Sequence, residues 1–96
     1  MITKQEILGA LGKDLPDLQK RFKVRKLALF GSYARGEQRA DSDVDILVEV
    51  DPSIGLEFVA LAERIERLLG VRIDLVSSRA VSSRAMELIG PELIYV

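Results

Sequence analysis

Residues 29–50, LFGSYARGEQRADSDVDILVEV, constrain the fold more than any other stretch of this 96-residue chain. An apolar run ends at Gly31-Ser32, a polar loop follows, and a second apolar run opens with the acids Asp43 and Asp45. Two carboxylates at the head of a buried strand are costly unless something cationic compensates them. The stretch therefore predicts two core strands joined by a loop, with a cation bound where the second strand begins.

Apolar periodicity predicts further elements on either side of this stretch. The strands are expected over residues 24–30, 44–50 and 71–76, with an edge strand over 93–96. The helices are expected from a capping box at Thr3 and Glu6 to about residue 12, over 16–22, over 56–69, and from Ser82 or Ser83 to residue 89. A single helical turn is expected over 32–35.

Two residues, Gly12 and Pro16, are expected to break the first helical segment into two. Strands that alternate with helices predict an α/β (or α+β) fold, a small mixed sheet backed by helices. The length predicts a single domain over residues 1–96.

Composition excludes several kinds of site. The chain has no cysteine and no histidine, so any metal must be bound by oxygen, which favours Mg²⁺, Mn²⁺ or Ca²⁺. A net charge of −1 argues against direct nucleic-acid binding. No apolar run approaches the roughly 20 residues of a membrane span, and the N-terminus lacks a signal-peptide layout. We therefore expect no membrane association and a cytoplasmic location.

Three acids stand on predicted strands. Asp43 and Asp45 are two residues apart, so they emerge from one face, about 6.6 Å apart along the backbone. Asp74 lies inside the third strand, between Ile73 and Leu75. If the second and third strands are neighbours, Asp74 completes a cluster that could hold two metal ions about 4 Å apart. The alternatives are a turn with solvated acids for the pair and an edge-strand acid for Asp74.

Groups that could bind phosphate surround these acids. At Gly31-Ser32 the backbone can approach a phosphate closely, and the amides and the Ser hydroxyl can donate to it. The alternative is a plain turn that ends the strand. Arg35 and Arg39 could neutralise phosphate charge or merely solubilise the loop. Arg72 shares the face of Asp74 and could pair with it or with a substrate.

Taken together, these positions resemble the minimal nucleotidyltransferases (MNT) of the DNA polymerase β superfamily. That signature is Gly-Ser, ten residues, then D-x-D, here Gly31-Ser32, residues 33–42 and Asp43-Val44-Asp45. The wider pattern GSxARGxxxxxSDxDxxV is matched at Gly31, Ser32, Ala34, Arg35, Gly36, Ser42, Asp43, Asp45 and Val48. RIDLV, which contains Asp74, matches the later strand with the third acid. The resemblance covers essentially the whole chain.

The resemblance implies a polymerase β-like core and Mg²⁺-dependent nucleotidyl transfer from ATP. Gly31 and Ser32 would hold the β- and γ-phosphates, with Arg35 and Ser42 as further nucleotide-binding residues. Asp43 and Asp45 would ligate two Mg²⁺ ions, which Mn²⁺ could replace. Asp74 would bind the catalytic metal and help to activate the acceptor hydroxyl.

The resemblance also implies a partner. MNT proteins of this size typically act as antitoxins that transfer AMP to a tyrosine of a HEPN-domain ribonuclease toxin, with release of pyrophosphate. Family members that act on small molecules or RNA add further domains, and these 96 residues contain none. Two alternatives stay open: an antitoxin that masks the toxin by binding alone, and a nucleotidyltransferase for a small molecule or an RNA end.

Overall fold

Four strands form one mixed sheet, in the order β3-β2-β1-β4, in the computed structural model, which describes residues 2–96. The strands are β1 (Val24–Phe30), β2 (Val44–Val50), β3 (Ile73–Ser77) and β4 (Ile94–Tyr95). The helices are α1 (Lys4–Phe22), α2 (Gly31–Arg35), α3 (Glu57–Leu69) and α4 (Ser83–Ile89), with 3₁₀ turns η1 (Pro52–Ile54), η2 (Ser78–Ala80) and η3 (Gly90–Glu92). The predicted fold class, a small mixed sheet backed by helices, is confirmed.

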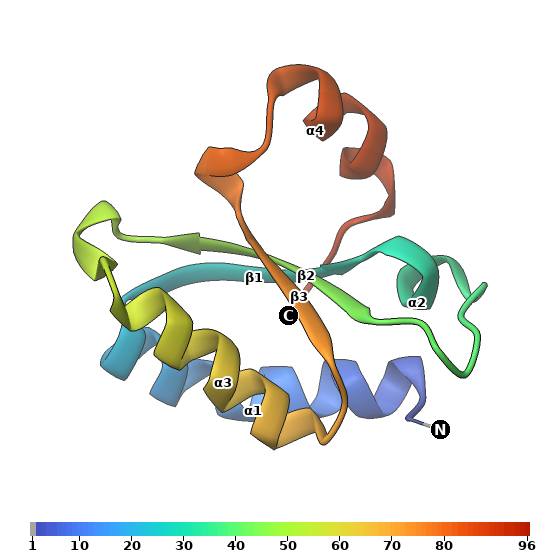
Figure 1. The fold of residues 1–96 in the computed structure, drawn as a ribbon, viewed down its shortest axis with the longest axis horizontal. Helices are drawn as coiled ribbons and strands as arrows, with labels where there is room; N and C mark the ends of the chain where they lie inside the picture. The colour runs from blue at the N-terminus through green and yellow to red at the C-terminus, as the bar shows by residue number, and fades with distance from the viewer. Residues whose placement is uncertain (1) are drawn as a thin grey trace.

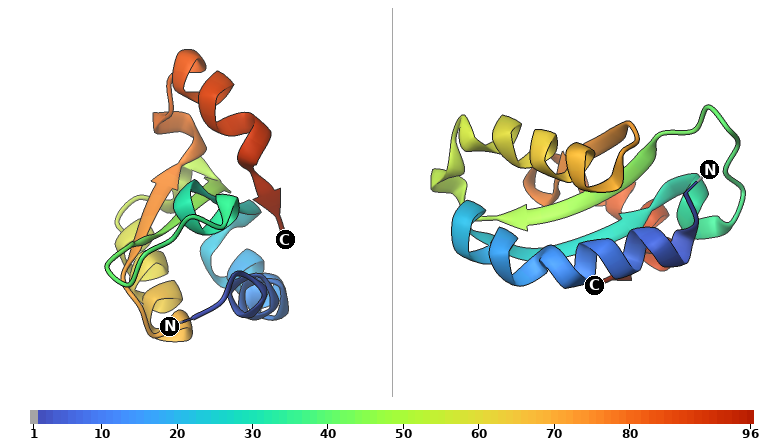
Figure 2. Two further views of the ribbon diagram at one scale, coloured as in Figure 1. Left: turned by 90° about the vertical axis from the view of Figure 1, so that its right-hand side faces the viewer. Right: turned by 90° about the horizontal axis from the view of Figure 1, so that it is seen from below.

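The connections explain the strand directions. Helix α2 and the loop over residues 36–43 join β1 to β2, and these two strands are antiparallel. β3 lies parallel to β2, which requires a crossover, and α3 supplies it. β4 returns to the far edge of the sheet and pairs antiparallel with β1. The two longest helices, α1 and α3, lie on one side of the sheet, whereas α4 lies on the other (Figures 1 and 2).

One face of the sheet carries the hydrophobic core. Val44, Ile46 and Val48 alternate along β2 and are fully buried together with residues of α1 and α3. The other members with no exposed surface are Ile7, Leu11, Leu18, Leu27, Leu29, Leu61 and Ile65. Because successive side chains of a strand alternate between faces, Asp45 lies on the opposite face, away from α1 and α3.

The predicted break in the first helix is wrong, because α1 continues from Lys4 to Phe22 with Pro16 inside it. A proline in a helix interior costs about 3 kcal/mol, since it removes one hydrogen bond, here to the carbonyl of Gly12. Pro16 and Gly12 both lie on the exposed side of α1, where water can reach that carbonyl. Four buried side chains on the opposite side of α1, each contributing about 1.5–3 kcal/mol, outweigh the loss.

The other boundaries differ by a few residues. β3 begins at Ile73 rather than at residue 71, because Gly70 ends α3 in a left-handed conformation and the chain must turn first. The predicted edge strand shortens to two residues. The capping box at Thr3 and Glu6 is present. Within residues 2–96, no helix combines the length and apolar character that crossing a membrane requires.

The continuity of α1 leads to a stability prediction. Replacing Pro16 by Ala restores the missing donor without disturbing a buried side chain, and should raise the free energy of unfolding by about 2 kcal/mol after the change in unfolded-chain entropy. Urea denaturation measures this. Gln19→Ala, at another exposed position of α1, is the control and should change stability by less than about 0.5 kcal/mol. An unchanged or lower free energy of unfolding for Pro16→Ala would show that Pro16 does not destabilise α1.

Candidate active site

Gly31 occupies the junction between β1 and α2, where strand passes directly into helix. Its φ is +77°, in the region that L-residues with a side chain rarely adopt. A Cβ built on Gly31 would overlap the carboxylate of Asp45. The sheet register brings about this approach, because Phe30 of β1 pairs with Asp45 of β2. Gly31 is therefore needed for its backbone conformation and for the space that it leaves to Asp45.

Asp45 also lies beside the third predicted acid. In the parallel pairing of β2 with β3, Asp45 is the register partner of Asp74. Asp45 is half-buried and Asp74 is exposed. The condition stated for Asp74, that these two strands are neighbours, is thus met, and the sheet aligns two acids that are 29 positions apart in sequence.

Neighbouring acids raise the cost of ionising Asp45 at this edge. Burial, together with the negative charges of Asp74 and Asp43, raises the pKa of the Asp45 carboxyl above its ordinary value. The guanidinium of Arg35 opposes this rise, and the carboxylate of Glu92 adds to it. A site with such an excess of negative charge attracts a cation.

Asp43 makes a different contact from the one expected of a metal ligand. Its carboxylate forms an ion pair with Arg72 at 3.4 Å, so Arg72 pairs with Asp43 rather than with Asp74. Both side chains are largely exposed, and ion pairs of this kind contribute about 0–1 kcal/mol. Among residues 2–96, no group of three or more acidic side chains is already close enough to hold a metal ion. The oxygen donors of Asp45 and Asp74 suit Mg²⁺, whereas Asp43 would have to turn from Arg72 to join them.

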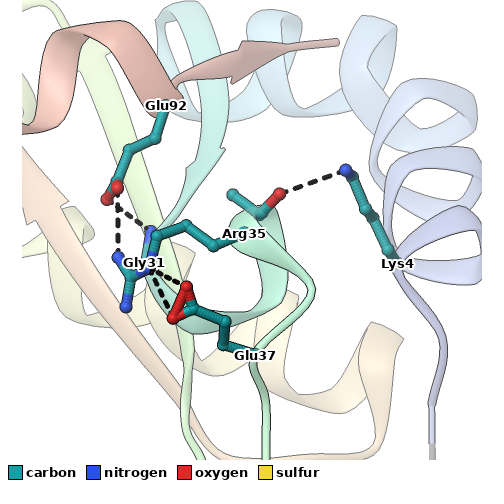
Figure 3. Close-up of polar contacts among 6 residues, drawn as sticks. Lys4, Gly31, Arg35, Glu37 and Glu92 are labelled. Atoms are coloured by element: carbon teal, nitrogen blue, oxygen red, sulfur yellow. Dashed lines mark hydrogen bonds and ion pairs between the residues drawn. The ribbon is translucent and has the colours of Figure 1, made fainter.

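Arg35 and Gly31 share one acidic partner, Glu92 of η3 (Figure 3). The Gly31 amide donates to Oε1 of Glu92 at 2.9 Å, and Nη1 of Arg35 donates to Oε2 at 3.0 Å. Glu37 contacts Nε of the same guanidinium at 3.4 Å. Burial raises the pKa of Glu92, but the hydrogen bonds from Gly31 and Arg35 outweigh it and leave that pKa below its ordinary value.

Glu92 was not anticipated from the sequence, because no motif spacing links it to Gly31. The pairing of β4 with β1 could have suggested it. Leu29 pairs with Ile94, so the same antiparallel register, continued by two residues, brings Glu92 opposite Gly31.

The two predicted phosphate-binding serines lie in different settings. Ser32 is the half-buried second residue of α2. The hydroxyl of Ser42 accepts a hydrogen bond from the Arg39 amide at 2.9 Å, and the Ser42 amide donates to the Arg39 carbonyl at 3.0 Å. Ser42 thus closes a turn in the loop before β2, and with Arg72 it lines a hollow of about 550 Å³.

A family model for the nucleotidyltransferase domain matches residues 13–92, which include every predicted site residue and Glu92. The chain belongs to the nucleotidyltransferase domain family. This nucleotidyltransferase domain is 44% identical to the protein adenylyltransferase MntA of Thermococcus cleftensis, over 100% of this chain and 98% of the relative.

Solved structures agree with this assignment. A protein proposed to be a minimal nucleotidyltransferase superposes with a TM-score of 0.79 at 36% identity, covering 97% of this nucleotidyltransferase domain and 95% of that chain. A chain of a toxin–antitoxin complex with AMP-PNP superposes with a TM-score of 0.63 at 26% identity, covering 98% of this domain and 72% of that chain. The prediction of a nucleotidyltransferase of the minimal type is confirmed.

The contact between Gly31 and Asp45 leads to a matched comparison of two glycines. Gly36 has a φ of +73°, but a Cβ there meets nothing within 4 Å. Gly36→Ala should therefore cost about 1–2 kcal/mol from backbone strain alone. Gly31→Ala should cost about 1–3 kcal/mol more, because the new methyl group collides with the Asp45 carboxylate.

Urea denaturation of both variants, of Asp45→Ala and of the double variant Gly31→Ala/Asp45→Ala measures these costs. Removing the carboxylate should recover the extra loss at Gly31, as a coupling between the two sites. Equal losses of stability for Gly31→Ala and Gly36→Ala would show that the Asp45 carboxylate does not require a glycine at position 31.

Proposed function

We propose that this chain is an antitoxin that transfers AMP from ATP to a tyrosine of a partner HEPN ribonuclease toxin and releases pyrophosphate. One observation carries the proposal: Asp45 lies beside Asp74 across the sheet and directly against Gly31, whose missing side chain leaves room for its carboxylate. The acids proposed to bind metal and the turn proposed to bind phosphate are thus adjacent, which supports transfer from a nucleoside triphosphate. The expected setting is the cytoplasm.

Each predicted site residue has a proposed role in the transfer. Gly31 would provide the turn, and Ser32 with the amides that follow Gly31 at the start of α2 would bind the β- and γ-phosphates, because the amides of a first helical turn favour anions. Arg35 would add positive charge there, and Ser42 would hold the loop that leads to the acids. The acceptor oxygen attacks the α-phosphorus, the bond from that phosphorus to the bridging oxygen of the β-phosphate breaks, and pyrophosphate leaves. Asp74 would help to take up the proton that the acceptor hydroxyl loses.

Asp43, Asp45 and Asp74 would hold the metal, and their oxygen donors suit Mg²⁺ or Mn²⁺. Bound Mg²⁺ supplies positive charge to the attacking and leaving oxygens of a phosphoryl transfer. The raised pKa of Asp45 supports this role, because uncompensated negative charge is what a cation relieves. Asp43 would exchange Arg72, its exposed partner, for the ion.

Two comparisons support the acceptor and the nucleotide. The relative from Thermococcus cleftensis is a protein adenylyltransferase, which supports a protein acceptor. The toxin–antitoxin complex was solved with AMP-PNP, which supports ATP as the donor. The HEPN toxin and its tyrosine follow from the resemblance to MNT antitoxins.

The first test is transfer itself. The wild-type chain, the HEPN partner and Mg²⁺ are incubated with ATP labelled either at the α- or at the γ-phosphate. Only the α-label should appear on the partner, because AMP is transferred and pyrophosphate leaves. The Asp43→Ala/Asp45→Ala variant should label nothing, whereas Asp41→Ala, an exposed acid of the same loop, should label normally.

Other outcomes have separate meanings. No label on the partner from the wild-type chain would refute protein adenylylation. Labelling that survives in the double variant would remove these acids from the mechanism. If the double variant labels nothing yet still neutralises the toxin in cells, binding alone is the antitoxin activity.

The role of Asp74 can be separated from nucleotide binding. Asp74→Asn should keep the affinity for Mg·ATP within about threefold and lower the rate of transfer by about 10²–10⁴, the usual contribution of a positioned acid–base group. Calorimetry and the labelling rate measure the two effects. Glu49→Gln, at an acid of β2 that shares the face of Asp45, should change neither. Equal loss of affinity and rate would show that Asp74 acts in binding and not in proton transfer.

A further inference from the structure

Glu92 is a largely buried acid whose two carboxylate oxygens are both used at the candidate site. Its side chain is 20% exposed. One oxygen accepts from the first amide of α2 and the other from the guanidinium of Arg35, so one carboxylate ties together the two predicted phosphate-binding elements (Figure 3). A carboxylate among groups that would bind phosphate has two physical interpretations. It either positions those groups, or it occupies the place of a phosphate that must displace it.

The surroundings of Gly31 favour positioning. Gly31 is buried, whereas Ser32, the next residue of α2, is half-buried. A phosphate approaching from solvent can therefore reach Ser32 before it reaches the Gly31 amide. Glu92 satisfies a helix donor that the ligand is poorly placed to use, and a buried donor without a partner costs about 1–3 kcal/mol.

Arg35 keeps donors for a ligand in this arrangement. The hydrogen bonds of its guanidinium within residues 2–96 use Nη1, to Glu92, and Nε, to Glu37. A guanidinium carries five N–H donors in a fixed plane, so one fixed edge orients the others. With 44% of its side chain exposed, Arg35 is held and yet accessible.

The backbone that carries Glu92 is held from both sides. It ends η3, directly after Pro91, whose ring fixes the backbone. Two residues later the chain enters β4, which pairs with Ala28 and Leu29 of β1. The edge strand thus anchors Glu92 from one side and the proline from the other.

We propose that Glu92 is the positioning residue of the nucleotide site, holding the Arg35 guanidinium and the start of α2 in the arrangement that receives the triphosphate of ATP. The C-terminal edge strand, which carries no predicted site residue, is thereby part of the nucleotide-binding apparatus. This inference rests on the proposed nucleotidyl transfer from ATP.

Glu92→Gln is the sharpest test, because the amide has the same shape and its single oxygen can still accept from Gly31, whereas its NH2 group cannot accept from Arg35. The dissociation constant of Mg·ATP, measured by calorimetry without the partner, should rise about 3–10-fold, since the charge-assisted hydrogen bond that orients Arg35 is lost. In the transfer assay the KM for ATP should rise similarly, with kcat within about threefold. Glu37→Gln removes the exposed partner of Arg35 and should change affinity less than about twofold.

A double-mutant cycle shows whether Glu92 acts through Arg35. In an Arg35→Ala background, Glu92→Gln should weaken Mg·ATP binding by less than about twofold, because the group that it orients is gone. A loss of full size in that background would mean that Glu92 acts independently of Arg35, and the inference would fail. Glu92→Ala, if folded, should bind more weakly than Glu92→Gln; thermal unfolding checks folding, and Glu92→Gln decides the question if Glu92→Ala does not fold.

The remaining outcomes separate this inference from the proposed function. Tighter Mg·ATP binding by Glu92→Gln would show that phosphate displaces Glu92, which overturns positioning. Unchanged affinity and KM in Glu92→Gln, with normal wild-type binding, would overturn the inference and leave the proposed function intact. A wild-type chain that does not bind Mg·ATP would refute the proposed function, and the role of Glu92 with it.

Discussion

The close approach between Gly31 and Asp45 is the constraint on which the candidate site depends. β1 and β2 are antiparallel neighbours in a register that pairs Phe30 with Asp45, so the backbone just after β1 must pass under the Asp45 carboxylate. Only a residue without a side chain allows this, and the turn into α2 uses a left-handed φ at the same residue. The turn proposed to bind phosphate and the acid proposed to bind metal are consequently set against each other by sheet geometry and not by a flexible loop.

The sheet can hold both a core and this site because its two faces differ in what they contact. Val44, Ile46 and Val48 point into the core under α1 and α3, where burial supplies much of the stability of a small fold. The intervening positions of β2 face the other side of the sheet, where Leu47 is buried and Asp45 is half-buried. The parallel crossover through α3 then brings Asp74 alongside. The alternation of side chains along β2 and the crossover to β3 thus bring Asp45 and Asp74 together from separate parts of the sequence.

Periodicity and turn residues predicted β1 and β2 to the residue, because both strands are apolar and end at a glycine or a charged loop. They failed at Pro16, where a local rule competes with a buried helix face that only tertiary packing reveals. The motif spacing associated Gly31 with Asp45, and the family resemblance added Asp74. It could not predict that Asp43 pairs with Arg72 or that Glu92 bridges Gly31 and Arg35, because those contacts depend on side-chain directions and on an edge strand of two residues.

The negative charge of Asp45 is unfavourable in the folded protein. The pKa of Asp45 is raised in the native state, mainly by burial and then by Asp74 and Asp43. Between the unfolded and the native pKa the native state binds more protons, so stability falls as the pH rises through that window and stays lower above it. At neutral pH the ionised Asp45 therefore opposes folding, and a bound cation would reverse that contribution by favouring the same charged form. The guanidinium of Arg35 offsets part of the negative charge of Asp45, but it is also paired with the carboxylates of Glu92 and Glu37. A divalent ion would supply the positive charge that Asp45 still lacks, and this is the physical reason to expect the proposed triphosphate to bind together with such an ion.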